Sequence, residues 1–439
     1  MIAPVLEFLV RLEGRPELGQ FVEHVSFSGL TFCHNDWTLP KTGFPSFQAA
    51  FEIPGALFAD GIRHCRIEAC EITQIGTYGI QLRRGCQDNV IAGNHIHDMG
   101  GGGIKIGDVG RFSSVAAHNE IVAESAERPS GGIRIGKEEV FRPNRPDQTR
   151  GMCVCDNVIH DGGKVHTGAV GVWIGLSAEN QVAHNEIYDL FYTGISVGWE
   201  WYNVPQGAYD NLIEFNHVHH VMKHTLCDGG GIYALGIQPG TIIRNNLIHD
   251  VYSYDRHSGR GIYLDACSYG IRIENNIIHH VRIAGLRLQR ATSGNIIRNN
   301  IIAFCDEAPL GWDTDRSNCF MQNIVLFTTE NLFTRDQFAS YDTVIDFNLY
   351  YNPCREFKFL GYSFAEWKKI KSRDLWDGEP TTLDAHSIIA DPCFMDAEKG
   401  DFRLKPDSPA LKLGFVPIPL DNVGPRKNKS MPGKTRTGE

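Results

Sequence analysis

The sequence lacks the features that mark a membrane protein or a secreted precursor. None of its 439 residues lies in an apolar run near the roughly 20 residues that a helix needs to cross a bilayer. The opening stretch, MIAPVLEFLVRLEG, carries Glu7 and Arg11 inside its apolar part and has neither a basic start nor a cleavage site. It therefore does not fit a signal peptide, and we expect no membrane partner.

Clustered positive charge is also scarce. The formal net charge is −10, whereas binding to phosphate backbones needs grouped Lys and Arg. The one basic run, GPRKNKSMPGKTRTG, lies near the C-terminus, and we expect residues 426–439 to form a disordered basic tail. These observations argue against a nucleic-acid partner.

Paired cysteines and common catalytic motifs are missing as well. The twelve cysteines do not have zinc-finger spacing, and Cys153-Val-Cys155 is too tight for a zinc knuckle. We expect most of them to be buried as small apolar residues. No phosphate-binding loop or nucleophile elbow is found. The sequence thus predicts no cofactor and no metal ligands.

What the sequence does contain is a repeat of two short phrases. The first has the form Asn-x-Ile-His and recurs as GNHIHDMG at 93, CDNVIHDGG at 155, HNEIYDL at 184, FNHVHHV at 215, NNLIHDV at 245, NNIIHHV at 275 and NNIIAFC at 299. The second recurs as GIQLR at 79, GIKIG at 103, GIRIG at 132, GVWIG at 171, GISVG at 194, GIYAL at 231, GIYLD at 261 and GLRLQ at 285.

Short alternating runs separated by Gly, Asn and Asp predict strands, and their repetition predicts stacked coils. The fold class is therefore all-β, a parallel β-helix solenoid whose inward aliphatic side chains form the core. Each repeated Asn should fall at the same bend, where its amide can bond along a ladder. The recurring histidines occupy a ladder position too, so we assign them a structural role: His97, His160, His219, His249 and His279.

The repeat also predicts how the chain is divided. We expect an N-terminal coil and loop over residues 1–60 and regular coils over 61–353. Residues 354–425, which include the segment GDFRLKPDSPAL, should form a cap, because an open end would expose sheet edges and core.

Aligning the Gly-Ile phrases predicts which side chains face outward. One outward column reads Gln81, Lys105, Arg134, Trp173, Ser196, Tyr233, Tyr263 and Arg287. Aromatic rings beside carboxylates suit a carbohydrate, because rings stack on sugar C–H faces while acids reach the glycosidic oxygen. The predicted substrate-binding residues are Trp173, Trp199, Trp201, Tyr233, Tyr263 and Arg287.

Two aspartates in adjacent coils are the candidate catalytic residues. Asp228 precedes the phrase at 231 and Asp265 closes the phrase at 261, and glycoside hydrolysis needs two carboxyl groups. They are offset by seven positions along the strand, so only a tight bend at Gly229–Gly231 would bring them together. Glu200 is therefore kept as a second candidate partner.

Other functions stay open at this point. A polysaccharide lyase or epimerase would need a Lys, Arg, Tyr or His base near an acidic calcium cluster. The run CDEAPLGWDTD offers such carboxylates in Asp306, Glu307, Asp313 and Asp315. A β-helix that binds carbohydrate without catalysis, or that is purely structural, is a further alternative.

The stretch from His166 to Asp265, with its GVWIG, SVGWEW and CDGGGIYALG phrases, resembles right-handed parallel β-helix proteins of the glycoside hydrolase family 141 type. The C-terminal run ADPCFMDAEKGDFRLKPDSPALKLGF is similar to that group too. The resemblance implies α-L-fucosidase or xylan-degrading activity on plant-type polysaccharide, with Asp228 and Asp265 as the two catalytic aspartates. It also implies a secreted or periplasmic monomer and relatives with a longer N-terminal region.

The chain departs from that group beside the candidate site. Ala266-Cys267 stands where relatives follow the second aspartate with Glu-Gly, and LRLQRAT stands where relatives often have a histidine-rich phrase. The resemblance therefore leaves open whether this chain has the family's activity or has diverged from it.

Overall fold

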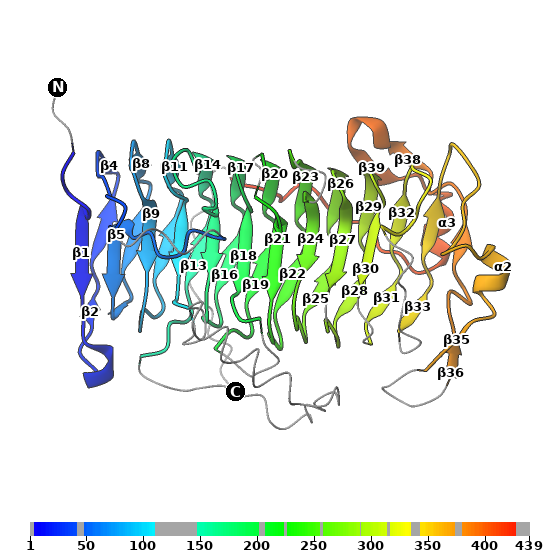
Figure 1. The fold of residues 1–439 in the computed structure, drawn as a ribbon, viewed down its shortest axis with the longest axis horizontal. Helices are drawn as coiled ribbons and strands as arrows, with labels where there is room; N and C mark the ends of the chain where they lie inside the picture. Colours follow the sequence, from blue (N-terminus) through cyan, green and yellow to red (C-terminus); the bar gives the residue numbers. More distant parts are fainter. Residues whose placement is uncertain are drawn as a thin grey trace.

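The computed structural model describes residues 4–41, 48–109, 147–201, 207–223, 226–254, 258–289, 291–313, 317–334, 343–373 and 380–426. Within these ranges, no helix has both the length and the apolar character needed to cross a bilayer. Successive coils follow one another along a single long axis (Figure 1).

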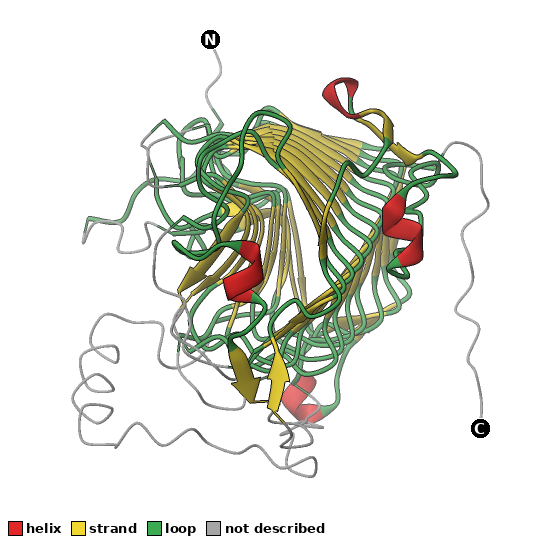
Figure 2. Ribbon diagram, turned by 90° about the vertical axis from the view of Figure 1, so that its right-hand side faces the viewer, coloured by secondary structure: helices red, strands yellow, loops and turns green. Residues whose placement is uncertain are grey.

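Three parallel sheets form the walls of the molecule, as the view along its axis shows (Figure 2). The first sheet contains β1 (Val10–Glu13), β5 (Gly55–Asp60), β9 (Tyr78–Leu82), β12 (Ile104–Ile106), β15 (Val172–Ile174), β18 (Ile195–Gly198), β21 (Gly230–Leu235), β24 (Arg260–Leu264), β27 (Ala284–Gln289) and β30 (Leu310–Asp313).

The second and third sheets alternate with the first along the chain. The second contains β3 (Ser26–Ser28), β7 (Arg66–Glu68), β10 (Val90–Ala92), β13 (Cys153–Cys155), β16 (Gln181–Ala183), β19 (Leu212–Glu214), β22 (Ile242–Arg244), β25 (Arg272–Glu274), β28 (Ile296–Arg298), β31 (Cys319–Met321) and β33 (Val344–Asp346). The third contains β4 (Thr31–Cys33), β8 (Glu71–Thr73), β11 (His95–His97), β14 (Val158–Gly162), β17 (Glu186–Leu190), β20 (His217–Val221), β23 (Leu247–Val251), β26 (Ile277–Val281), β29 (Ile301–Cys305), β32 (Ile324–Leu326), β34 (Leu349–Tyr351) and β37 (Ile388–Ile389).

Each coil passes through the first, second and third sheet in turn, so the predicted parallel β-helix is confirmed. The earliest coil begins at β1, and β2 (Val22–Glu23) pairs with β6 (Ile62–Arg63) at one of its corners. The phrase at 132–136, with Arg134, lies outside the described residues, and β12 pairs directly with β15.

Aliphatic side chains from all three sheets fill the interior. In the first sheet one inward column is fully or almost fully buried: Ile80, Ile104, Val172, Ile195, Ile232, Ile262 and Leu286. Burying such side chains contributes about 1.5–3 kcal/mol each, which makes this continuous column a main source of stability.

The predicted asparagine ladder is confirmed at the corner between the second and third sheets. Each side-chain amide donates to the amide oxygen of the next coil, for example from Asn216 to Asn246 at 3.0 Å and from Asn246 to Asn276 at 2.9 Å. The second amide hydrogen bonds a backbone carbonyl, as Asn246 does to Ile213 at 3.0 Å. The ladder runs unbroken from Asn94 to Asn348.

The C-terminal region covers one end of the solenoid. There α2 (Phe364–Trp367), the hairpin of β35 (Lys371–Arg373) with β36 (Pro380–Thr382), and β37 follow the last full coil. Trp367 is buried, stacks on Phe359 at 5.5 Å and donates from Nε1 to Asp384 at 2.7 Å.

The segment GDFRLKPDSPAL does not close that end. Its strand β39 (Asp401–Leu404) pairs with β38 (Phe394–Asp396), joined by η2 (Ala397–Lys399), and Phe402 packs on the outside of the third sheet against His279 at 5.1 Å. After α3 (Pro409–Lys412), the chain runs back along the solenoid (Figure 1). A further short helix, η1 (Pro16–Leu18), lies near the N-terminal coil.

Residues 413–426 form a strap across the coil corners. Val416 exchanges two hydrogen bonds with the Asn299 side chain at 2.7 and 2.8 Å, and Gly424 donates to the Phe215 carbonyl at 2.8 Å. Arg426 then pairs with Asp156, with Nε 2.8 Å from Oδ1. Arg426 thus belongs to the ordered strap rather than to the basic tail in which the sequence placed it.

Candidate functional site

The predicted outward column is confirmed for the described part of the first sheet. Strand pairing puts Trp173 beside Ser196, Ser196 beside Tyr233, Tyr233 beside Tyr263, and Tyr263 beside Arg287. The rings contact one another: the centroids of Tyr233 and Tyr263 lie 5.1 Å apart. Trp199 contacts Trp173 at 5.8 Å, Trp201 at 5.1 Å and Tyr233 at 6.2 Å.

These aromatic side chains are nevertheless buried, so they do not form the open platform that the register suggested. Trp173, Trp199, Tyr233 and Tyr263 are at most 2% exposed. Phe51 stacks on Trp173 at 6.4 Å and meets Trp199 edge-on at 6.2 Å, so the segment around Phe51, just before β5, covers this part of the sheet. The alternation of side chains along a strand predicts the direction in which each one points. It does not predict whether a loop from elsewhere in the chain covers that side chain.

Lys105 fixes this cover in place. Its Nζ donates to the carbonyl of Phe51 at 2.6 Å and also to that of Ile53, and it lies 5.0 Å from the Tyr78 ring centroid. Burial lowers the pKa of Lys105 to about 7. The sequence placed Lys105 in the outward column but gave it no role.

Three buried polar atoms under this cover have no hydrogen-bond partner within the described structure: Trp173 Nε1, Ser196 Oγ and Trp199 Nε1. Unpaired buried groups are rare in proteins and usually indicate a water molecule or a ligand. Trp199 also has a φ of 139°, a backbone conformation that is unusual for a residue with a side chain. Such strain costs on the order of 1–3 kcal/mol and concentrates at functional sites.

Asp265 lies directly after β24 and is 7% exposed. Its Oδ2 accepts a hydrogen bond from the buried Tyr233 hydroxyl at 2.8 Å. Burial, followed by the charge of Asp265, raises the pKa of Tyr233 well above its usual value. The Tyr233 hydroxyl therefore keeps its proton and donates it in this hydrogen bond. The following residues, Ala266 and Cys267, belong to the turn after the strand.

Asp228 lies at the other end of the same strands, just before β21. Its side chain is 41% exposed, and its Oδ1 is 3.9 Å from Nη1 of Arg260. The Tyr192 hydroxyl donates to the Asp228 carbonyl at 2.6 Å, which holds the turn. The Arg260 guanidinium lies 4.4 Å from the Tyr263 ring centroid.

The three glycines at 229–231 do not form the tight bend that the sequence suggested. The two aspartates are connected through other side chains instead. Gly230 and Gly231 are part of β21, and Gly230 pairs with Arg260. A Cβ on Gly230 would lie 2.6 Å from the Arg260 carbonyl oxygen, and one on Gly231 would lie 2.4 Å from an Ile248 methyl. Glycine is therefore required here for close packing.

The seven-residue offset between the aspartates consequently remains along the strands. Arg260, Tyr263 and Tyr233 lie between the two carboxyl groups. Burial and then the charges of Asp265 and Asp228 raise the pKa of Tyr263 well above its usual value, so both carboxylates act on this ring. The sequence missed Arg260, although it directly precedes the second Gly-Ile-Tyr phrase.

The remaining predicted site residues have other surroundings. Glu200 is 4% exposed and follows the strained Trp199, whereas Trp201 is only partly buried. Arg287 is buried, pairs with Asp313 and donates from Nη1 to Thr334 at 2.8 Å. Asp313 therefore serves an internal ion pair.

The acidic run proposed as a calcium cluster is divided between separate partners. Asp306 pairs with Arg282 at 2.9 Å, whereas Asp313 pairs with Arg287. Glu307 is exposed, and Asp315 lies outside the described residues.

The outer side of the third sheet carries the predicted histidine ladder. His97, His160, His219, His249 and His279 stack along it, with Tyr188 between His160 and His219, at centroid distances of 4.6 to 5.3 Å. The predicted ladder position of these histidines is confirmed.

Comparisons with known proteins agree with this architecture. The model of the right-handed beta helix region matches residues 23–138 and 204–325, more than half of the chain, which confirms the predicted handedness. No curated protein matches the chain.

Several solved structures are similar. One described as a glycoside hydrolase has a TM-score of 0.56 and 22% identity over 70% of this chain and 51% of that one. PfbA, a surface adhesin of Streptococcus pneumoniae, has a TM-score of 0.50 and 11% identity over 89% and 84% of the two chains. This chain thus spans about half the length of the glycoside hydrolase, and the likenesses show a common fold. The resemblance to family 141 in particular stays a prediction.

Proposed function

Because the chain belongs to the right-handed beta helix region family, we propose that it is a carbohydrate-active enzyme that hydrolyses glycosidic bonds on the outer side of the first sheet. The glycoside hydrolase with the same fold supports this choice of reaction. The proposed substrate is a plant-type polysaccharide with fucoside or xylan-like units, acted on outside the cytoplasm.

The observation that carries the proposal is the group of buried polar side chains between Asp228 and Asp265. A β-helix needs aliphatic side chains inside, but nothing in its packing requires a buried carboxylate, guanidinium and two phenols on its outer side. Burying charged groups costs free energy unless they are paired, and such groups concentrate at functional sites. Arg260, Tyr263, Tyr233 and Asp265 form that arrangement here.

In this proposal the two aspartates are the acid–base pair. Inverting glycosidases have carboxyl groups about 6.5–9.5 Å apart, whereas retaining ones have them about 5–5.5 Å apart. Because Arg260 and Tyr263 lie between the two carboxyl groups, the arrangement argues against the short separation of a retaining enzyme. The Tyr233 hydroxyl orients Asp265, and Arg260 lies beside Asp228.

The test is a screen for monosaccharides released from mixed plant glycans, followed by assays of single variants. Asp228→Asn and Asp265→Asn should each reduce turnover at least 10²-fold while the circular dichroism spectrum stays unchanged. Asp401→Asn is the matched control, because Asp401 is also paired with an arginine, Arg403, but lies in β39 on the outside of the third sheet. Unchanged turnover in either site variant would remove that aspartate from the mechanism.

One contact favours a second candidate function, that of a polysaccharide lyase or epimerase. Arg260, beside the Tyr263 ring, supplies a cation that would neutralise a sugar carboxylate and so ease abstraction of the neighbouring proton. Incubation with uronic-acid polymers distinguishes this reaction, because a lyase forms unsaturated products that absorb in the ultraviolet. Glycan binding without release of any product would instead indicate a non-catalytic binding protein.

A further inference from the structure

Two groups of side chains in the described residues hold imidazole and carboxylate atoms close enough to share one metal ion. They are His95, His97 and His160, and Glu186, His217 and His219, each with its ligand atoms within 4.8 Å of one another. In both, a His-x-His pair on one strand directs two rings to the same side, because strand side chains alternate. The difference between the groups lies in the hydrogen bonds that their nitrogen atoms make.

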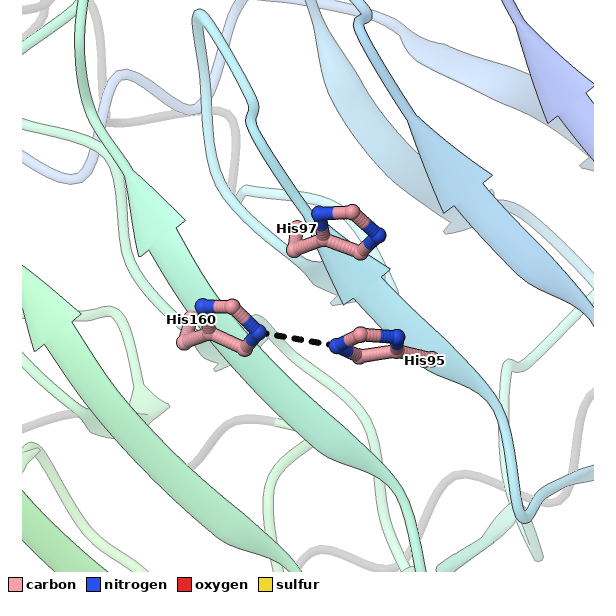
Figure 3. Close-up of side chains that lie close together, drawn as sticks. All are labelled: His95, His97 and His160. Carbon is pink, nitrogen blue, oxygen red and sulfur yellow. Dashed lines mark hydrogen bonds between the residues drawn. The ribbon is translucent and has the colours of Figure 1, made fainter.

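In the first group four of the six ring nitrogen atoms have partners at hydrogen-bond distance. His95 Nε2 lies 2.8 Å from His160 Nε2 (Figure 3). His97 contacts Thr73 Oγ1 through Nδ1 and Glu71 Oε1 through Nε2, both at 3.3 Å. Both nitrogen atoms of His97 and the facing nitrogen atoms of His95 and His160 are thus paired within the protein, and we call this the satisfied group.

In the second group the contacts to the carboxylate are too long for hydrogen bonds. Glu186 Oε1 lies 3.5 Å from His217 Nδ1 and 3.7 Å from His219 Nε2. Ligand atoms bound at about 2.0–2.1 Å in a tetrahedral zinc site are separated by about 3.4 Å. The buried His219 Nε2 has no hydrogen-bond partner within the described structure.

The hydrogen bonds behind His217 determine which of its nitrogen atoms carries the proton. The Asp250 carboxylate lies 2.6 Å from His249 Nδ1, so Nδ1 of His249 donates and its Nε2 is an acceptor. His217 Nε2, at 2.8 Å from that acceptor, must therefore donate. The lone pair of His217 Nδ1 then faces the Glu186 oxygen, which is also an acceptor.

The hydrogen bonds behind His217 also stabilise the charged form of Asp250. Burial alone would raise the pKa of Asp250, but hydrogen bonds from Tyr252 and His249 lower it below its usual range. His249 in turn holds the His217 ring through Nε2, in the way that hydrogen bonds to the second ring nitrogen orient metal-bound histidines.

We propose that Glu186, His217 and His219 bind a zinc ion that joins β17 to β20 on the outer side of the third sheet. Two imidazoles and one carboxylate leave a fourth position for water. Because the ligands come from adjacent coils, binding stabilises the stacked form relative to the unfolded chain. This site lies on a different sheet from Asp228 and Asp265, so it is independent of the proposed hydrolysis.

The test uses full-length protein without a histidine tag, treated with EDTA and dialysed, and titrated calorimetrically with zinc chloride at pH 7.5. We expect one equivalent to bind the wild type and to raise Tm. Glu186→Gln and His219→Ala should each weaken binding at least tenfold and abolish the zinc-dependent rise in Tm. Glu186→Gln keeps the shape of a partly exposed side chain, so its fold should survive.

His97→Ala is the matched control, because it removes a ring from the same ladder within the satisfied group. It should bind zinc like the wild type. Absence of binding to the wild type, unchanged binding in Glu186→Gln and His219→Ala, or loss of binding only in His97→Ala would each overturn the proposal.

Discussion

Replacing Asn246 with alanine tests how much of the stability of the solenoid comes from the asparagine ladder. The Asn246 side chain donates to Ile213 O at 3.0 Å and to Asn276 Oδ1 at 2.9 Å. Its own Oδ1 accepts from Asn216 N and Asn216 Nδ2, each at 3.0 Å. The substitution therefore removes four hydrogen bonds at a buried corner.

A buried hydrogen bond contributes about 1 kcal/mol net, and an orphaned buried group costs about 1–3 kcal/mol. We therefore expect Asn246→Ala to lower the free energy of unfolding by about 4 kcal/mol, measured by urea unfolding followed by circular dichroism. Asn245→Gly is the matched control: the neighbouring Asn245 has a φ of 54°, which glycine adopts readily. It should change stability by less than about 1 kcal/mol. Equal effects of the two substitutions would refute a stabilising ladder.

Two further predictions concern the strap and the histidine stack. Arg426→Ala should remove the bidentate pair with Asp156 and lower the free energy of unfolding by roughly 1–3 kcal/mol. Proteolytic cleavage between residues 413 and 426 should become faster. Unchanged cleavage would contradict a strap held by Arg426. Burial, followed by the charges of His249 and His280, lowers the pKa of His279 to about 3, so the folded protein binds fewer protons than the unfolded chain below pH 6.5. Acidification from pH 7.5 to pH 5 should thus lower the free energy of unfolding by about 2 kcal/mol through His279. His279→Phe keeps the ring contact with Phe402 and should reduce that loss. An equal loss in the wild type and the variant would refute this role of His279.

The repeat determined what could be predicted about the fold. The inward aliphatic residues, the asparagine corner and the order of the outward column all follow from a period that the sequence displays directly. The strap and the position of the β38–β39 hairpin could not be predicted, because they depend on contacts between residues far apart in the chain, such as Arg426 with Asp156 and Phe402 with His279.

The candidate site was predicted less completely for the same physical reason. The register placed Tyr233 beside Tyr263 and put Asp265 at the end of the phrase, and the structure agrees. The burial of Trp173 depends on Phe51, which a single coil does not reveal. The glycines before Tyr233 suggested a bend because the sequence does not show the Arg260 backbone packed against them.

The most direct test of the proposed function is a crystal structure of the Asp265→Asn variant soaked with an oligosaccharide that the wild type cleaves. The account predicts that the sugar lies on the outer side of the first sheet, with the scissile oxygen within hydrogen-bond distance of residue 265 and Arg260 beside the chain. Asp228 should lie on the opposite face of the same sugar ring. A sugar bound on the second or third sheet, or one that contacts neither aspartate, would contradict it.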